Sequence, residues 1–410
     1  VPGNEVVVRN LDDIAAVTGT GRDPYSYLGI TQQLLQDNFG VDKVMGEVLQ
    51  RARIIFTSQL NWNLLTMALR TLVLSKLRYL FTVGSRAWRK LSMMMHFAQE
   101  VDVALRKMMV ECKVRYKAAA VSRLYLDRAK GGLGMPSVVA AAQESVVEVC
   151  VYALLHPGME AVRYFHDAIG KSGKRNIFSD CNTVLKEFQM QVEPGDACVI
   201  VTNADGSKAT YEDYVALTRY LRSKMNEKRN EDNFSAWRQM PLAGKVMQLS
   251  GIDLETSFYW LKKGATSPIV VRNIVAAQEY CLLTRACPGS GSLDKICRKC
   301  GDGVETVDHI LSHCATWLPT LYVERHDKVA RCVYFRICEQ YGLPIVHYTN
   351  QIPACVSNEN AEVRWDAIIP TAGRIHHNRP DMVVYDKVKR PCETAASENQ
   401  QVYDKLRKYA

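Results

Sequence analysis

The sequence predicts a multidomain, mostly α-helical protein whose final part changes to mixed helix and strand. The chain has 410 residues, and at roughly 100–200 residues per domain this length corresponds to two to four domains. Apolar residues recur at helical spacing over much of the chain before a Gly- and Ser-rich linker at 288–292. With 47% hydrophobic and 23% charged residues, the composition excludes a disordered or collagen-like chain. We expect no membrane span, since no apolar run approaches about 18 residues.

The opening residues, 1–30, have strand and turn composition. A β-branched run at 5–9 and a second candidate strand at 25–30 are separated by Gly and Pro. From Thr31 to Lys130 leucines and methionines recur at three- and four-residue steps with few breaks, which predicts helices. The chain begins at Val1 rather than Met and has no secretory leader, so we expect it to be part of a longer polypeptide.

The middle of the chain begins with a Gly-rich break at 131–137, after which helix is expected through Leu155. Residues 170–210 are expected to be rich in loops. Helices are expected again at 211–228 and at 267–283, where Ser267 precedes Pro268 as an N-cap precedes a first-turn proline.

Positive charge is concentrated in one segment. The chain carries a formal net charge of +9, whereas residues 51–130 alone contain 16 Lys and Arg against 4 acidic residues. A local excess of this kind is typical of a surface that faces a polyanion. Solvated helix faces whose acidic partners lie elsewhere in the fold are the alternative.

Three of the thirteen cysteines stand at metal-ligand spacing. Cys297, Cys300, His309 and Cys314 form the pattern C-x2-C-x8-H-x4-C. Three thiolates and one imidazole suit a closed, structural Zn²⁺ site, and His313 is a rival fourth ligand. The other cysteines are expected to be small buried hydrophobes in a reducing compartment.

A weaker pattern of acids and lysines follows near the end of the chain. Asp381 begins an apolar strand directly after Pro380, Glu393 follows, and Lys405 lies on a final amphipathic stretch. Two carboxylates at a strand bend can hold Mg²⁺, and a nearby Lys can orient the water that attacks a phosphodiester. Taken alone, the pattern fits a solvated edge strand with surface charges better than a nuclease site.

Four features, in order, resemble the carboxy-terminal part of the polyprotein of non-LTR retrotransposons that carry a restriction-like endonuclease. Residues 27–30 resemble the primer-grip turn of the polymerase, and residues 131–137 (GGLGMPS) resemble the motif that ends the thumb. The C-x2-C-x8-H-x4-C cluster is similar to the family's CCHC zinc knuckle. Residues 325–327 (RHD) and 379–381 (RPD) resemble motifs of its PD-(D/E)XK-type nuclease domain.

The resemblance implies five parts. They are the end of the reverse transcriptase palm (1–30), a basic helical thumb (31–137), a helical linker (138–290), the zinc knuckle (291–320) and a small α/β PD-(D/E)XK-like nuclease domain (321–410) that is truncated or degenerate. It implies Asp381 and Glu393 as metal-binding acids, Lys405 as the catalytic lysine and Mg²⁺ as the nuclease cofactor. It also implies template RNA and target DNA as partners, nuclear localisation, and no contact with a membrane.

Within this resemblance, the basic segment corresponds to thumb helices that contact phosphates without reading sequence. The residues expected to make these contacts are Arg86, Arg89, Lys90, Arg106, Lys107, Lys113, Arg115, Lys117 and Arg123. Arg298 and Lys299 of the knuckle are candidates for sequence readout. Arg325 and His326 are expected to support nucleic-acid binding or structure, and a lone His on a helix face is more often structural.

Two departures from the family leave the enzymatic activity open. The paired aspartates of the polymerase would lie upstream of Val1, so this chain alone is not expected to polymerise. The segment before Glu393 is short and contains Pro391, which puts the second acid in doubt. We therefore weigh a DNA-nicking fragment that serves target-primed reverse transcription against a catalytically dead or domesticated nucleic-acid-binding remnant. A zinc-stabilised protein-interaction module is a third, less favoured hypothesis.

Overall fold

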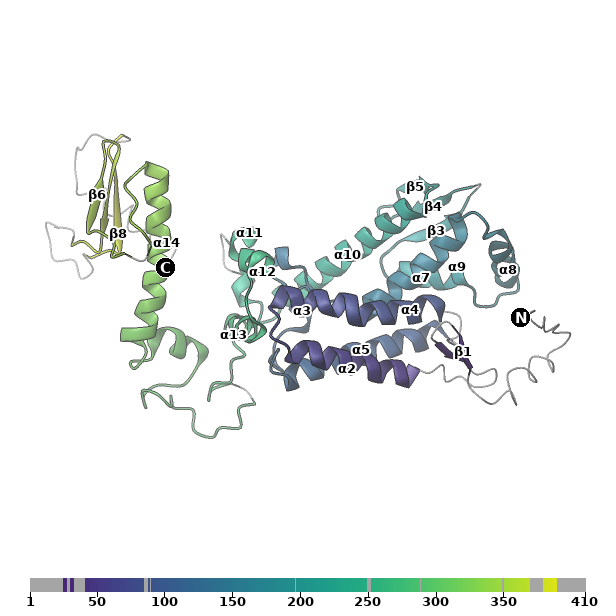
Figure 1. Cartoon of the computed structure of the whole chain (residues 1–410), viewed down its shortest axis with the longest axis horizontal. Helices are drawn as coiled ribbons and strands as arrows, with labels where there is room; N and C mark the ends of the chain where they lie inside the picture. The colour runs from purple at the N-terminus through teal and green to yellow at the C-terminus, as the bar shows by residue number, and fades with distance from the viewer. Residues whose placement is uncertain are drawn as a thin grey trace, which may run out of the picture. The chain divides into compact units, whose positions relative to one another are not determined.

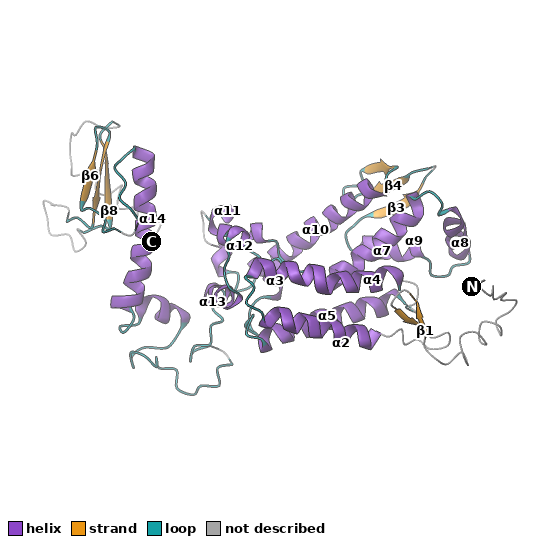
Figure 2. Ribbon diagram, in the orientation of Figure 1, coloured by secondary structure: helices purple, strands orange, loops and turns teal. Residues whose placement is uncertain are grey.

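The chain forms two compact units, Val1–Leu283 and Thr284–Ala410, which are described separately below as the first and second units. The computed structural model describes residues 25–27, 30–32, 41–84, 88, 90–195, 197–248, 252–287, 289–348, 350–368 and 379–388. The described part is mostly helical, with short strands in both units (Figure 2), as the sequence predicts.

The described part of the first unit is a helical assembly with a two-stranded sheet, β1–β2, and a three-stranded sheet, β3–β4–β5 (Figure 1). Its described strands are β1 (Tyr25–Tyr27), β2 (Ile30–Gln32), β3 (Gln191–Pro194), β4 (Val199–Thr202) and β5 (Lys208–Tyr211). Its described helices are α2 (Val41–Thr57), α3 (Trp62–Ala68), η1 (Leu69–Leu74), α4 (Ser75–Val83), α5 (Leu91–Glu111), α6 (Val121–Tyr125), η2 (Arg128–Lys130), α7 (Val138–Leu155), α8 (Glu160–Lys171), α9 (Ile177–Lys186), α10 (Tyr214–Arg238), η3 (Lys245–Gln248), α11 (Leu254–Ser257), α12 (Tyr259–Lys263) and α13 (Pro268–Gln278).

Helix α7 occupies the centre of the first unit. It packs against α4, α5, α9 and α10, and twelve of its eighteen residues are buried. Asp102 of α5 caps its start by accepting hydrogen bonds from the N–H groups of Val138 (2.9 Å) and Val139 (3.2 Å). Although α7 is long and apolar enough to cross a membrane, 67% of it is buried in the protein, as in the core helix of a globular fold. The expectation that no segment reaches this length was therefore too strict.

One hydrophobic core extends through both the predicted thumb and the predicted linker. It includes Leu77 and Leu105 from before the expected boundary at 137, and Val147 and Leu221 from after it. The expected helices at 211–228 and 267–283 are present as α10 and α13. Ser267 caps α13 by accepting a hydrogen bond from the N–H of Val270, directly before Pro268.

The expectation of a loop-rich segment at 170–210 was wrong. This segment contains α9 and the antiparallel sheet β3–β4–β5. Val199 and Val201 of the central strand are fully buried while Ile200 and Thr202 are half-buried, the alternation of a strand with one face on a core. The strands are four residues each, so their pattern is too short to stand out from the Gly and polar residues around them.

The Gly-rich segment at 131–137 follows α6 and η2 and packs backbone against backbone. Gly132, Leu133 and Met135 donate hydrogen bonds to the carbonyls of Asp127 (2.9 Å), Arg123 (3.0 Å) and Leu124 (3.0 Å). A Cβ atom on Gly132 would lie 2.1 Å from the carbonyl oxygen of Leu126. The glycine is therefore required for close approach of two chain segments.

The second unit contains the Cys/His cluster and a small α/β arrangement. Its described elements are η4 (His309–His313), η5 (Leu318–Tyr322), α14 (Val323–Tyr341), β6 (Cys355–Ser357), β7 (Ala361–Trp365) and β8 (Met382–Asp386). The three strands are antiparallel in the order β6–β7–β8. Tyr334 and Cys338 of α14 are fully buried in one small core with Val363 of β7. The predicted mixture of helix and strand is therefore present here.

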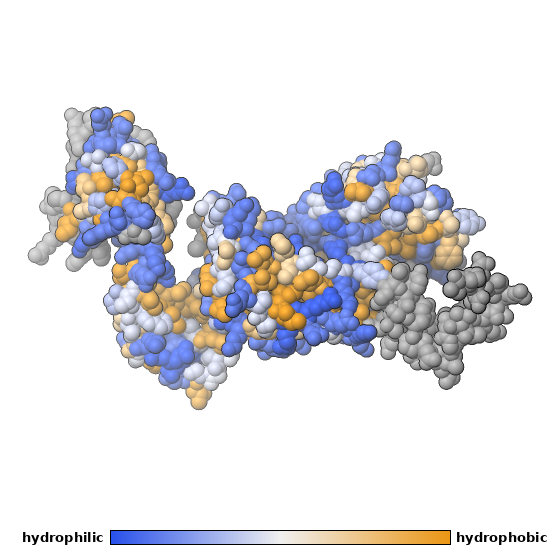
Figure 3. All heavy atoms as spheres, in the orientation of Figure 1, coloured by the Kyte–Doolittle hydropathy of each residue, from blue (hydrophilic) through white to orange (hydrophobic). Residues whose placement is uncertain are grey.

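One face of the first unit remains apolar. Leu64, Met67 and Leu72, on α3 and η1, are 45%, 58% and 52% exposed. Figure 3 shows apolar atoms gathered on a face of this unit.

Candidate metal centre and nucleic-acid contacts

The four predicted metal ligands converge. The ligand atoms of Cys297, Cys300, His309 and Cys314 all lie within 4.8 Å of one another. The Sγ atoms of Cys297 and Cys314 are 3.9 Å apart, and Cys300 Sγ is 3.3 Å from His309 Nε2. A tetrahedral Zn²⁺ ion would place two sulfurs about 3.8 Å apart, and a sulfur and a nitrogen about 3.5 Å apart, given bonds of about 2.3 and 2.0 Å. The cluster therefore has the ligands and the size to bind a metal ion.

The first two ligands are held by a tight turn. Gly301 and Gly303 have φ angles of 67° and 72°, and a Cβ on Gly303 would lie 3.3 Å from the His309 ring. Burial raises the pKa of the Cys297 thiol, but hydrogen bonds from the backbone N–H groups of Cys300 and Lys299 outweigh it and lower this pKa to about 6. Cys297 is thus favoured as a thiolate at neutral pH, the form that ligates metal.

The remaining two ligands lie on and after η4. His309 begins this short helix and Cys314 directly follows its end. The rival ligand His313 is directed away, with its Nδ1 3.2 Å from the carbonyl oxygen of Asp308. Of the two histidines, His309 belongs to the cluster.

A buried carboxylate links the metal turn to the start of the second unit. Glu305 is 2% exposed and accepts hydrogen bonds from the backbone N–H groups of Arg298 (2.8 Å) and Arg285 (3.0 Å). The Arg298 guanidinium binds both of its oxygens, at 2.6 to 3.1 Å. The Arg298 side chain, chiefly, lowers the pKa of Glu305 to about 2. Both Arg298 and Lys299, the candidates for base readout, are exposed, but the charge of Arg298 is already paired with Glu305.

The two motifs assigned to the nuclease domain meet in space. His326 Nε2 lies 3.1 Å from Asp381 Oδ2, and His326 Nδ1 lies 3.2 Å from Asp327 Oδ1. The neighbouring Arg325 donates to the carbonyl of Leu311 at 2.9 Å. The second acid and the lysine of the expected nuclease site, Glu393 and Lys405, lie outside the described residues.

Two of the arginines expected to contact phosphates are buried. The Arg123 side chain is 0% exposed, forms an ion pair with Glu279 at 3.4 Å and stacks on Trp237 at 4.5 Å. Arg115 is 8% exposed, and its guanidinium donates to the carbonyl of Ala119. The expectation that these two residues contact phosphates was wrong, because their guanidinium groups are buried and bind other groups of the first unit.

Four of the expected phosphate ligands are exposed lysines. Lys90 precedes α5, Lys107 lies in its last turns, and Lys113 and Lys117 follow it. Among the described residues none of the four forms an ion pair. At 1.5 Å per residue of α5, about 25 Å of helix separates Lys90 from Lys107, and Lys113 and Lys117 follow the far end of the helix. A nucleic acid that contacts all four would have to extend along this helix.

The other two candidates of this segment are less accessible or lie outside the described part. Arg106 is half-buried and donates a hydrogen bond to the hydroxyl of Tyr125 at 2.9 Å. Arg86 and Arg89 lie outside the described residues.

Sequence reasoning missed a group of arginines around Glu144 of α7. Glu144 is 6% exposed, accepts hydrogen bonds from Arg78 and Arg229, and forms an ion pair with Arg222 at 3.5 Å. The available signal was the pair of acids, Glu144 and Glu148, within a largely apolar helix, because a buried carboxylate requires cationic partners.

No protein-family model, curated protein or solved structure matches this chain.

Proposed function

We propose that this chain is a zinc-stabilised, nucleic-acid-binding part of the polymerase–endonuclease polyprotein of a non-LTR retrotransposon. In this proposal it acts in the nucleus, holds template RNA and target DNA, and serves target-primed reverse transcription. The observation that carries the proposal is the convergence of Cys297, Cys300, His309 and Cys314 on one point. Along the sequence, this cluster follows the helical first unit and precedes the α/β part of the second unit, which is the order that the resemblance implies.

Zinc is the metal that these donors favour. Three sulfurs and one imidazole nitrogen match a closed tetrahedral Zn²⁺ site, whereas Mg²⁺ prefers oxygen ligands. With four protein ligands, the ion would stabilise the fold of the turn and η4 and would take no part in a reaction. The side chains of Cys297, Cys300, His309 and Cys314 would hold the zinc ion.

Binding to nucleic acid is supported by the exposed lysines of the first unit. Lys90, Lys107, Lys113 and Lys117 carry charges that no carboxylate among the described residues neutralises. Such charges attract phosphates without sequence preference. Arg115 and Arg123 are left out of the proposed contact surface because they are buried.

The binding proposal is tested with the whole chain and labelled RNA and DNA in a filter-binding assay. Because bound phosphates release counterions, the affinity should fall steeply between about 50 and 200 mM salt. Replacing Lys107, Lys113 and Lys117 together by Gln should weaken binding to all sequences and flatten this salt dependence. Replacing three exposed lysines that lie outside α5 and the segments flanking it in sequence, Lys43, Lys186 and Lys263, is the matched control. Absence of binding, or binding that ignores salt, would exclude the proposal.

A binding protein without nuclease activity is the second candidate function, and one contact favours it. Asp381, the first acid of the expected nuclease site, lies against the imidazole of His326 at 3.1 Å. An imidazolium at this carboxylate would compete with Mg²⁺. Among the described residues, the one group of three or more convergent metal-ligand side chains is the Cys/His cluster.

The two candidates are distinguished with supercoiled plasmid and Mg²⁺. Nicking that is abolished by Asp381→Ala would favour the endonuclease, whereas nicking that survives this substitution would exclude Asp381 as its metal-binding acid. Binding to DNA without nicking at any Mg²⁺ concentration would favour the binding protein.

A further inference from the structure

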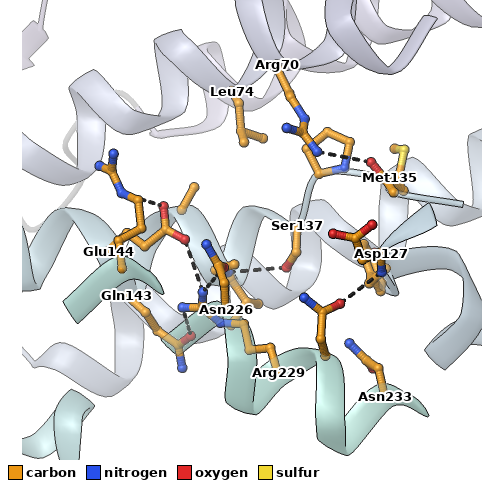
Figure 4. Close-up of a pocket in the computed structure, with 18 of the residues that line it drawn as sticks. Arg70, Leu74, Asp127, Met135, Ser137, Gln143, Glu144, Asn226, Arg229 and Asn233 are labelled. Carbon is orange, nitrogen blue, oxygen red and sulfur yellow. Dashed lines mark hydrogen bonds and ion pairs between the residues drawn. The ribbon is translucent and has the colours of Figure 1, made fainter. Parts of the chain in front are cut away.

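A large groove in the first unit is lined mostly by charged and amide side chains. It has a volume of about 920 Å³ and lies between the segment α3–η1–α4, the Gly-rich segment, α7 and α10 (Figure 4). Arg70 points into it from one wall, and Asn226, Arg229 and Asn233 point into it from α10 on the other. None of these four residues belongs to the basic surface described above.

Six cations line the groove together with four carboxylates, those of Asp127, Glu144, Glu187 and Asp232, so positive charge is in excess. Arg78, Arg222 and Arg229 converge on Glu144, and the Arg229 guanidinium lies 3.0 Å from its Oε1. Three arginines on one buried carboxylate leave a positive excess, which Glu148 reduces by pairing with Arg78 and Arg222.

Three further cations of the groove have no carboxylate partner among the described residues. They are Arg70, Arg128 and Lys262. Arg70 donates only to the carbonyl of Gly134, at 3.3 Å, and Arg128 donates to the hydroxyl of Thr66. Burial and the nearby Arg70 charge lower the pKa of Arg128, as expected of two like charges that face one space. An anion would relieve this repulsion.

The groove also offers amide groups in a regular row. Asn226, Asn230 and Asn233 stand four and three residues apart on α10, so they lie on one helix face. The amide of Gln143 on α7 also lines the groove, but its Nε2 donates to Glu187 (2.7 Å) and its Oε1 accepts from Arg229 (3.0 Å). Amides both donate and accept hydrogen bonds, as the edges of nucleic-acid bases do. Apolar residues, among them Leu74 and Met135, form part of the lining.

We propose that this groove binds a segment of single-stranded nucleic acid, with its phosphates on Arg70, Arg128 and Lys262 and its bases toward the amides of α10. The proposal rests on nucleic-acid binding by the chain and assigns it a second, separate contact site. A single strand fits better than a duplex because amide side chains reach base edges most readily when the bases are unpaired. An acidic peptide would also satisfy the cations, and its backbone would pair with the amides. Nucleic acid is favoured here by the proposed function of the chain, and an acidic peptide is the competing outcome of the test.

The test uses the full chain and labelled oligouridine and oligothymidine, with binding measured over a range of salt concentrations. Arg70→Gln with Lys262→Gln removes two proposed phosphate contacts without breaking an ion pair among the described residues. For a single strand the slope of log K against log salt should become about 1.4 less steep. Lys43→Gln with Lys263→Gln changes charge equally, and both of these exposed lysines lie outside the groove lining. This control should leave the slope unchanged.

The outcomes separate the groove from the wider proposal. If the chain binds both oligonucleotides but the groove variant binds like its control, the groove inference is wrong and the proposed function stands. If no oligonucleotide binds, both fail. Polyglutamate that displaces either oligonucleotide as well as unlabelled oligouridine does would overturn the groove inference in favour of an acidic peptide. Weaker binding to oligothymidine than to oligouridine would support RNA as the strand that occupies the groove, and the reverse would support DNA.

Discussion

Arg123 and Glu279 form an ion pair whose two side chains are both 0% exposed, with Arg123 Nη1 3.4 Å from Glu279 Oε1. The residues are 156 positions apart in the chain. Arg123 also donates to the carbonyl of Gly131 at 3.0 Å, and Glu279 accepts from the N–H of Ala120 at 2.7 Å. The pair therefore connects α6, the Gly-rich segment and the end of α13 within one core.

Breaking this pair should destabilise the first unit strongly. Burial raises the pKa of Glu279 and lowers that of Arg123, so each charge depends on the other. Arg123→Ala would leave Glu279 buried without its partner, and we expect a loss of about 3–5 kcal/mol in the free energy of unfolding. Urea unfolding followed by circular dichroism measures this loss.

Two further variants show whether the cost comes from the unpaired charge. Arg123→Met with Glu279→Gln removes both charges and should cost less than Arg123→Ala alone. Arg53→Ala removes an exposed pair with Glu111, whose side chains are 54% and 58% exposed, and should cost less than about 1 kcal/mol. Equal losses for Arg123→Ala and Arg53→Ala would show that the buried pair does not stabilise the unit.

The same pair shows where prediction from sequence ends. Residue type and a basic neighbourhood placed Arg123 among the phosphate contacts, and no local pattern indicates a partner 156 positions away. By contrast, the Ser267–Pro268 cap and the ligand spacing at 297–314 were predictable, because their geometry is set by residues close together in sequence. Local chemistry fixes turns, caps and knuckles, whereas burial of a charge depends on tertiary packing.

The small sheets are a second feature that could not be predicted from the sequence. Val199–Thr202 is a four-residue strand within a polar segment, and its pairing depends on neighbours rather than on its own pattern. The groove could not be predicted from the sequence either, because its walls come from segments around Arg70, Gln143 and Arg229 that are far apart in the chain. The contact between His326 and Asp381 likewise joins two motifs that the sequence presents 55 residues apart.

Removal of one metal ligand should unfold the region around the Cys/His cluster. We expect about one zinc ion per chain by elemental analysis, and its loss in Cys297→Ser, because binding to such a site supplies folding free energy. Protease should then cleave the segment 297–314 faster. Cys332→Ser is the control, since Cys332 is exposed on α14 of the same unit. Full zinc content in Cys297→Ser would contradict the assigned ligand set.

Gly132→Ala should destabilise the first unit, although it adds only a methyl group. The new Cβ would lie 2.1 Å from the Leu126 carbonyl oxygen, and a backbone atom cannot move aside as a flexible side chain can. We expect a loss of at least about 2 kcal/mol. Gly46→Ala is the matched control, because no atom lies within 4 Å of its Cβ position and helix α2 should gain about 0.5–1 kcal/mol. A thermal midpoint of Gly132→Ala equal to that of the native chain would exclude the close approach.

The imidazole of His326 should titrate above its ordinary pKa of about 6.5. The hydrogen bond with Asp327 raises this pKa most, partial burial opposes it, and Asp381 raises it further. Contact with these carboxylates therefore stabilises the second unit. This contribution is complete below about pH 6.5, and it is lost as the pH rises through the higher pKa of the folded state. In an NMR titration, Asp327→Asn and Asp381→Asn should each lower the pKa of His326. Glu324→Gln, on the same helix but paired with Lys328, should leave it unchanged. Equal values in all three variants would mean that neither aspartate holds the proton on His326.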